Sequence, residues 1–233
     1  ERADCVVVWA SVDRSLGRAA IKSFIVEKGT PGMDVVRLEK KLGIKASDTA
    51  AITFTDCRIP ASNLLGDPEV NVEKGFAGVM QTFDNTRPVV AAMAIGVAKA
   101  SLDRTREIMS KLKLKADYRT PVKLSTQMEA KLYRYEAEWE AARLLTLKAA
   151  WMADNGMPNS KEASMSKAKA GRTASEITLG CVEMLGSLGY SEEEMLEKWA
   201  RDSKILDIFE GTQQIQQLIV ARRLLGKSSA ELK

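Results

Sequence analysis

Residues 124–156 read LSTQMEAKLYRYEAEWEAARLLTLKAAWMADNG, and this stretch decides the class of the fold. It is dominated by Ala, Leu, Glu and Lys, which have high helix propensity, and it contains neither Pro nor Gly before Gly156. Asn155-Gly156 then provides a stop in the left-handed backbone region. The pattern predicts a helix from about Leu124 to Ala153, and therefore a chain whose later part is helical.

The same composition extends back to Glu73, which predicts further long helices before this one. Pro88 suits the first turn of such a helix, because its missing N–H is not needed there. Asn85 and Thr86 are the candidate caps of that first turn.

Two more helices are expected after Gly156. Asn159 or Ser160 can cap a third helix, which would end near Gly186. A last helix would follow Gly211-Thr212. Ile215, Leu218 and Ile219 would lie on one face of this helix.

The beginning of the chain favours β-strands. Hydrophobic and alternating patterns predict strands at 6–9, 21–26 and 51–54. Turn residues in EKGTPGMD (27–34) and RIPASN (58–63) separate them. We therefore predict an α+β fold that is mainly α.

The predicted architecture has two parts. A partial antiparallel β domain occupies residues 1–68, and an antiparallel four-helix bundle occupies residues 69–233. The sequence has no internal repeat and no low-complexity tract.

Composition excludes several classes of function. The chain has no histidine, which removes Ser-His-Asp and Cys-His nucleophile pairs and HExxH zinc sites, so proton transfer falls to carboxylate, Lys, Tyr or Cys. The three cysteines are far apart, which predicts neither a disulfide framework nor a metal site, and favours a reducing compartment. We expect no membrane span, because no apolar stretch is long enough, and no secretory signal, because ERADCVVVWAS (1–11) lacks the basic and hydrophobic regions of one.

Charge gives little support for a nucleic-acid partner. The 35 basic and 31 acidic residues are spread along the sequence, as on a solvated helical surface, and leave a net charge of only +4. Lysines in 111–123 are the one feature that suggests a basic module, and a filter-binding salt titration would test it. We expect no nucleic-acid binding.

Three segments in order resemble the acyl-CoA dehydrogenase family, most closely its medium-chain members. KLGIKASDTAAITFTDCRIPASNLLG (41–66) resembles the family's β-domain strand and exit loop, and KGFAGVMQTFDNTRPVVAAMAIGVAKASLD (74–103) resembles its first bundle helices. RDSKILDIFEGTQQIQQLIVARRLLG (201–226) is similar to its C-terminal signature. The resemblance implies the second half of the enzyme, so that the chain is either a truncation or one part of a divided protein.

The resemblance implies that Glu210 in FEGT is the catalytic base, which removes the α-proton of an acyl-CoA thioester while a hydride leaves for FAD. Its backbone N–H would help to polarise the thioester carbonyl. Gly211 would keep the backbone open for the acyl chain. The alternative is that Asp207 and Glu210 form a D-x-x-E capping arrangement at a helix start.

Further substrate and flavin contacts follow from the same resemblance. Asp84 and Arg87 in FDNTRP resemble acyl-CoA contacts, and the alternative for them is a helix-start carboxylate and a solvated arginine. Thr212 and Gln214 resemble the flavin-contacting pair after the base. Their alternative is a capping threonine and a surface glutamine.

One flavin motif departs from the family pattern. Q-x-x-G-G-x-G-Y of the family reads EMLGSLGY at residues 183–190, so Glu183 and Ser187 replace a glutamine and a glycine beside Gly186. A negative charge is poorly placed near the expected adenosine and pyrophosphate.

A second motif is replaced outright. The family's R-x-x-F-G-x-P reaches the pyrophosphate across a subunit interface, and KLKLKADYRTPVKLSTQ (111–127) stands in its place. Gln127 still matches the glutamine that follows the motif. The residues that could substitute for the arginine, with a solvated basic loop as the alternative, are Lys111, Lys113, Lys115 and Arg119.

The first hypothesis is an FAD-dependent acyl-CoA α,β-dehydrogenase of fatty-acid β-oxidation that passes electrons to an electron-transfer flavoprotein. The resemblance implies a tetramer built from dimers whose flavins bridge subunits. The alternative is a non-catalytic subunit that keeps the fold and binds flavin weakly. The compartment is expected to be bacterial cytoplasm or the mitochondrial matrix.

Overall fold

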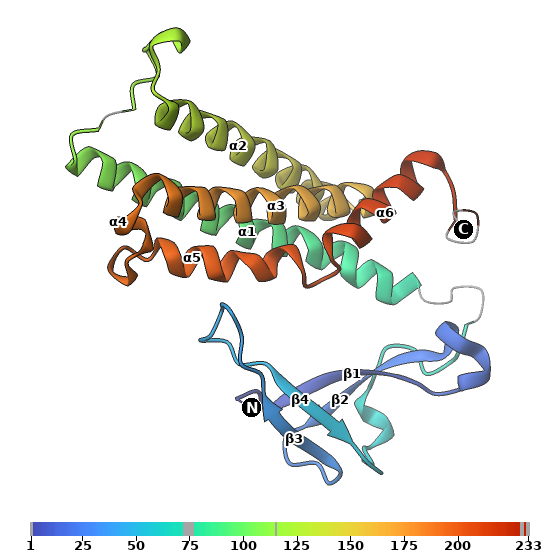
Figure 1. Ribbon diagram of the computed structural model, residues 1–233. Helices are drawn as coiled ribbons and strands as arrows, with labels where there is room; N and C mark the ends of the chain where they lie inside the picture. Colours follow the sequence, from blue (N-terminus) through green and yellow to red (C-terminus); the bar gives the residue numbers. More distant parts are fainter. Residues whose placement is uncertain (1, 72–76, 115, 229–230, 232–233) are drawn as a thin grey trace. The chain divides into compact units, whose positions relative to one another are not determined.

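The computed structural model describes residues 2–71, 77–114, 116–228 and 231. The chain divides into two compact units, Glu1–Gln81 and Thr82–Lys233, which are described separately (Figure 1). The first contains small antiparallel sheets and the second contains helices, so the predicted mainly α, α+β fold is confirmed. The predicted boundary between residues 68 and 69 stays a prediction.

The first unit has two antiparallel sheets. In one sheet β2 lies between β1 and β5, and in the other β3 pairs with β4 through a register shift between Val35 and Arg37. The three predicted strands are confirmed within β1, β2 and β4, whereas the sequence prediction missed β3 and β5. The strands are β1 (Cys5–Ser11), β2 (Ile21–Glu27), β3 (Met33–Leu38), β4 (Ala50–Phe54) and β5 (Leu64–Leu65).

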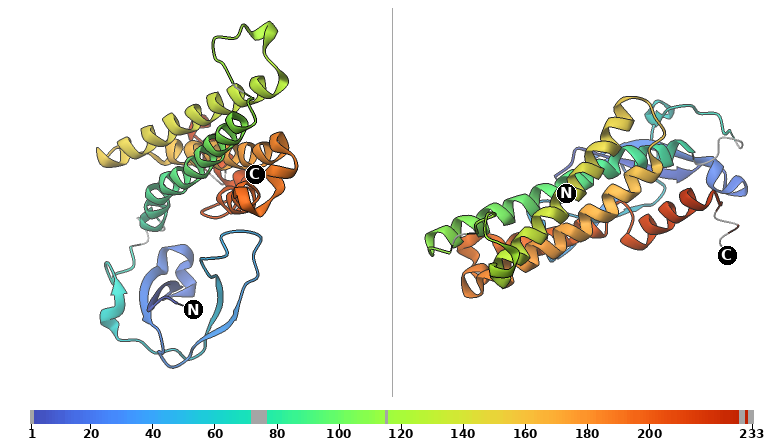
Figure 2. Two further views of the ribbon diagram at one scale, coloured as in Figure 1. Left: turned by 90° about the vertical axis from the view of Figure 1, so that its left-hand side faces the viewer. Right: turned by 90° about the horizontal axis from the view of Figure 1, so that it is seen from above.

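The second unit is a bundle in which α3 packs beside α2 and also contacts α5 and α6 (Figures 1 and 2). Its helices are α1 (Ala77–Lys111), α2 (Gln127–Asp154), α3 (Ser160–Leu185), α4 (Ser187–Tyr190), α5 (Leu196–Ser203) and α6 (Gln213–Leu225). The first unit also contains two short 3-10 helices, η1 (Arg14–Ala20) and η2 (Ala61–Asn63). Those of the second unit are η3 (Val122–Leu124), η4 (Glu192–Glu194) and η5 (Lys204–Asp207). None of the described helices is long and apolar enough to cross a membrane.

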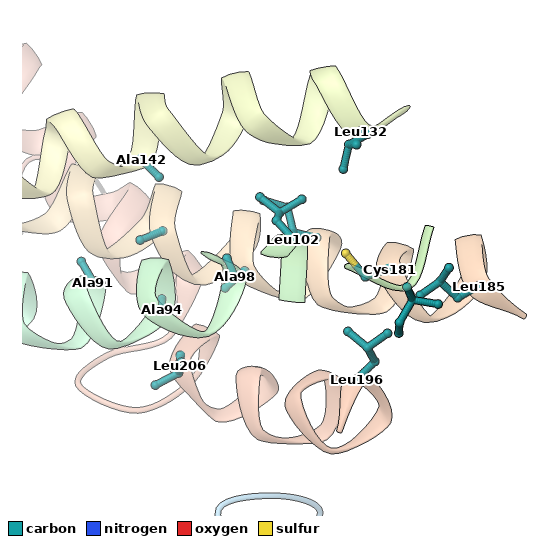
Figure 3. Packing of buried hydrophobic residues seen from close by; sticks show 14 of the residues in the cluster. Ala91, Ala94, Ala98, Leu102, Leu132, Ala142, Cys181, Leu185, Leu196 and Leu206 are labelled. Atoms are coloured by element: carbon teal, nitrogen blue, oxygen red, sulfur yellow. The ribbon is translucent and has the colours of Figure 1, made fainter. Parts of the chain in front are cut away.

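Small side chains bring the helices of the bundle close together. α1 contributes Ala91, Ala94 and Ala98, each fully buried and spaced at helical intervals on one face. They belong to the core cluster shown in Figure 3, together with leucines of α1, α2 and α5. An alanine face lets neighbouring backbones approach closely.

The predicted end of α2 and both predicted ends of α3 are confirmed, whereas α2 begins at Gln127 and not at about Leu124. Thr126 and Glu129 form a reciprocal capping box at the start of α2, and Asn155 occupies its C-cap. Gly156 follows at φ +65°. α3 begins at Ser160 and ends at the Gly186 C-cap.

The predicted helix start at Pro88 is wrong, because Pro88 lies inside α1 and neither Asn85 nor Thr86 caps a helix. A proline leaves the carbonyl four residues earlier without its helical donor. Here that carbonyl belongs to Asp84, and Asn159 Nδ2 donates to it at 3.4 Å. A side chain from the α2–α3 connection thus compensates the interruption and lets α1 continue.

Candidate functional site

The FEGT segment forms a left-handed turn between η5 and α6. Glu210 has φ +57° and Gly211 has φ +97°. A residue other than glycine in this region costs on the order of 1 kcal/mol, and such residues gather at functional sites. The surrounding structure must therefore hold Glu210 in place.

Two fully buried side chains hold this turn through its carbonyl oxygens. Gln216 Nε2 donates to the carbonyls of Glu210 (2.9 Å) and Gly211 (3.1 Å). Lys167 Nζ, from α3, donates to the carbonyl of Gly211 at 2.6 Å. Both Lys167 and Gln216 have 0% exposure. The turn is thus fixed from α3 and from α6 at the same peptide.

The Glu210 carboxylate has a defined position on the other side of the turn. Thr86 Oγ1, from α1, donates to Glu210 Oε2 at 2.8 Å, and the Glu210 side chain is half-buried. The alternative of a D-x-x-E capping pair is wrong. Asp207 instead accepts from Lys204 at 3.2 Å, and α6 begins only at Gln213.

Asp84 and Arg87 form a buried ion pair on α1. Arg87 Nη1 lies 2.5 Å from Asp84 Oδ1, with the side chains 4% and 16% exposed. Burial lowers the pKa of Arg87 and raises that of Asp84, while their mutual attraction acts in the opposite direction on each. The alternative of a solvated arginine is therefore wrong, whereas the predicted contact with acyl-CoA stays a prediction.

Charges of both signs surround the FEGT turn. The pKa of Lys167 is lowered to about 8, mainly by burial and to a smaller extent by Arg87, while Asp207 and Glu210 act in the opposite direction. Glu210 also interacts with Arg87. A half-buried carboxylate that a hydroxyl holds in one orientation can accept a proton from a molecule bound within hydrogen-bond reach.

Sequence reasoning missed Lys167 and Gln216. A signal for Lys167 exists in the stripe formed by Ala163, Ala170 and Ala174, all fully buried, since a lysine interrupts an otherwise small and apolar face. Gln216 gave no comparable signal, because glutamines are abundant along α6.

The predicted flavin contacts lie in two separate groups. Thr212 and Gln214 are exposed at the start of α6, where Thr212 is the N-cap residue without a side-chain cap bond. Gln127, Glu183, Gly186 and Ser187 lie where α2 begins and α3 ends.

The two groups are far apart within one chain. Lys167, which touches the FEGT turn, and Glu183 are therefore about 24 Å apart along the axis of α3, at about 1.5 Å per residue. One chain therefore presents two partial sets of flavin contacts, which stay predictions.

Electrostatics at Glu183 differ from the sequence expectation of an unfavourable negative charge. Lys131 Nζ donates to Glu183 Oε2 at 2.7 Å, which offsets that charge. Beside it, Gly186 is exposed at φ +56°, and nothing lies within 4 Å of the place where its Cβ would stand. Exposed backbone, the Ser187 hydroxyl and the Gln127 amide are groups that fit a dinucleotide with phosphates.

The basic segment between α1 and α2 gives no clear substitute for the missing arginine. Arg119 binds Asp117 at 3.0 Å and is 90% exposed. Lys111 ends α1 and Lys113 has φ +60°, whereas Lys115 lies outside the described residues. The pyrophosphate role of this segment stays a prediction.

Gly211→Ala is expected to destabilise the fold by at least about 1–2 kcal/mol, because Ala disfavours this φ. In addition, its Cβ would lie 2.5 Å from Gln216 Nε2. Gly226→Ala is the matched control, with φ +64° and nothing within 4 Å. Urea unfolding of both variants measures the difference. Equal losses would show that Gln216 does not restrict the turn.

Lys167 should make stability depend on pH in a defined window. The folded chain releases this proton near pH 8, whereas the unfolded chain holds it until its ordinary value of 10.5. The lowered pKa means that burial of the charge costs stability below pH 8, and that this cost disappears as pH rises toward 10.5. Relative to Lys167→Met, the wild type should therefore gain stability between pH 8 and 10.5 in urea titrations. A pH-independent difference would contradict the burial of this charge.

Comparison with known proteins adds a family match. Residues 73–225 match the family model described as acyl-CoA dehydrogenase, C-terminal domain. The mitochondrial short-chain specific acyl-CoA dehydrogenase of Rattus norvegicus is 40% identical over 223 residues, which is 96% of this chain and 52% of that protein.

Two solved structures are also similar to nearly the whole of this chain. Butyryl-CoA dehydrogenase from Megasphaera elsdenii is 37% identical with a TM-score of 0.84, over 96% of this chain and 56% of that one. A chain in a structure of the electron transferring flavoprotein of Acidaminococcus fermentans is 33% identical with a TM-score of 0.86, over 97% and 58%. The chain spans about half the length of the curated relatives it matches, at 52% of the first.

Proposed function

Because this chain belongs to the acyl-CoA dehydrogenase family, we propose that it carries the catalytic base of an FAD-dependent acyl-CoA α,β-dehydrogenase. The observation that carries the proposal is Glu210, held at φ +57° with its carboxylate fixed by Thr86. Backbone strain at a carboxylate is expected where the position of that carboxylate serves a reaction.

Glu210 removes the α-proton of the thioester in this proposal. Thr86 donates to Oε2, which leaves Oε1 to accept the proton. The charges of Arg87 and Lys167 both act on Glu210 across the site. The backbone N–H of Glu210 contributes to polarising the thioester carbonyl, and Gly211 leaves room for the acyl chain.

Bound FAD supplies the acceptor for the hydride that leaves the β-carbon. Thr212 and Gln214 hold it at one end of the bundle. The second group holds it at the other end and consists of Gln127, Glu183, Gly186 and Ser187. Since these two groups are about 24 Å apart along α3, we propose that neighbouring subunits each contribute one group, within a dimer of dimers that passes electrons to an electron-transfer flavoprotein.

A short-chain acyl-CoA is the proposed substrate, and Asp84 and Arg87 are its proposed polar contacts. The support comes from relatives named for short-chain acyl-CoA and butyryl-CoA, although the sequence motifs resemble medium-chain members most. Asp84 and Arg87 lie on the same helix as Thr86, one to two residues from the hydroxyl that binds Glu210.

The test is flavin bleaching in the purified flavin-loaded protein under anaerobic conditions. Butyryl-CoA should bleach the flavin within one turnover, and palmitoyl-CoA should do so far more slowly. Flavin that stays oxidised with every acyl-CoA tried would favour the alternative of a non-catalytic subunit. That alternative rests on Glu183, whose charge Lys131 offsets, and on the altered basic segment at residues 111–127.

A further inference from the structure

Lys167 has no role in the function proposed so far beyond its charge, yet its place in the bundle is unusual. It lies on α3 with 0% exposure, among alanines and one turn from Ala163 and Gly171. An apolar side chain would fill this space without the desolvation that a lysine suffers. A lysine is expected at such a buried position only where its ammonium group donates a hydrogen bond to a specific acceptor.

The acceptor is the carbonyl of Gly211, at 2.6 Å from Nζ. The charged groups that face Lys167 are Arg87 from α1, Asp207 from η5 and Glu210 from the turn. Asp207 already accepts from Lys204 at 3.2 Å and lies 3.7 Å from Arg172. The hydrogen bond that the structure describes for Lys167 goes to the Gly211 carbonyl and not to a carboxylate.

We propose that Lys167 is a positioning residue for the proton acceptor: its bond to the Gly211 carbonyl holds the Glu210–Gly211 peptide in the left-handed turn and thereby aims the Glu210 carboxylate at Thr86. This inference rests on the proposed function of Glu210. Gln216 binds the same carbonyl at 3.1 Å, so loss of Lys167 loosens the turn without releasing it.

Activity gives the first arm of the test. Lys167→Met keeps length and volume but removes the donor, and Lys167→Gln keeps an N–H donor. Since a misplacement of about 1 Å costs up to roughly 100-fold in rate, Lys167→Met should lower kcat by about 10-fold to 100-fold. Lys167→Gln should recover part of that loss. KM for butyryl-CoA should change by less than about threefold, because the substitution does not alter contacts that bind the substrate and the transition state equally.

Lys169→Met is the matched control. Lys169 lies two residues further along α3, is 35% exposed and pairs with Glu138 on the surface of the bundle. Its kcat should equal that of the wild type. Wild-type kcat in folded Lys167→Met, or an equal loss in Lys169→Met, would overturn the proposal.

The second arm does not depend on catalysis. The amide of Thr212 shares a peptide bond with the Gly211 carbonyl, so its NMR signal reports the bond from Lys167. Burial lowers the pKa of Lys167 to about 8. In wild-type protein the Thr212 amide should therefore shift with a midpoint near pH 8, and in Lys167→Met this transition should vanish.

The two arms separate failure of this inference from failure of the proposed function. If Glu210→Gln stayed active while the Thr212 titration followed Lys167, the proposed function would be wrong and the positioning contact would stand. A Thr212 amide that titrates identically in wild type and Lys167→Met would overturn the inference, whatever the activity.

Discussion

Glu210→Gln is expected to reduce turnover by at least about 10² to 10⁴-fold, the range typical for loss of a general base. Glutamine keeps the shape of the side chain and can still accept from Thr86 Oγ1, but it lacks the basic oxygen pair that takes the proton. The chain contains no histidine that could replace it. The fold and the affinity for acyl-CoA should change little.

Steady-state turnover with butyryl-CoA, together with circular dichroism, measures this effect. Glu162→Gln is the matched control, because it removes another largely buried carboxylate of the same bundle, whose partners are Lys148 and Lys161. It should retain wild-type turnover. Near-wild-type activity in Glu210→Gln would return Glu210 to a structural role.

The second large effect is expected from Arg87→Met, which should lower the free energy of unfolding by about 3–5 kcal/mol. Removing the guanidinium leaves the Asp84 carboxylate buried without its partner at 2.5 Å. The variant therefore exposes the cost of a buried carboxylate that has lost its ion pair and keeps the hydrogen bond with Ser160 and the attraction of Arg223. Asp84→Asn combined with Arg87→Met removes both charges and should recover much of the loss.

Arg143→Met is the matched control for this ion pair. Arg143 pairs with Glu140 at the same spacing of three residues, at 2.9 Å, but both side chains are more than 40% exposed. Its loss should cost only about 0–1 kcal/mol. A loss in Arg87→Met as small as that in Arg143→Met, by urea unfolding, would contradict the burial of the Arg87 pair.

Local sequence signals predicted those elements whose ends are encoded locally. The Asn155-Gly156 stop after α2 and the glycine at the end of α3 are such signals, and both helix ends were predicted correctly. The start of α1 was misplaced, because the donor that replaces the N–H missing at Pro88 comes from Asn159, many residues away. Strand β3 was missed because MDVVRL is short and carries charges at both ends of its hydrophobic pair.

The candidate site was predictable only in part for the same reason. FEGT marks Glu210 by its motif, and the left-handed turn agrees with the glycine that follows. The contacts that hold the turn, from Thr86, Lys167 and Gln216, join α1, α3 and α6 and depend on how these helices pack. No local pattern in the sequence identifies the partners in these contacts. The lysine within the alanine face of α3 indicates only that a buried donor has an acceptor.

The most direct test of the central claim separates proton removal from hydride transfer. An acyl-CoA whose β-carbon is replaced by sulfur can lose its α-proton but has no β-hydride to give. In D2O, the flavin-loaded wild-type protein should exchange the α-protons of this analogue, as followed by proton NMR, and Glu210→Gln should exchange them at least about 10²-fold more slowly. Exchange at the wild-type rate in Glu210→Gln would contradict the assignment of Glu210 as the base.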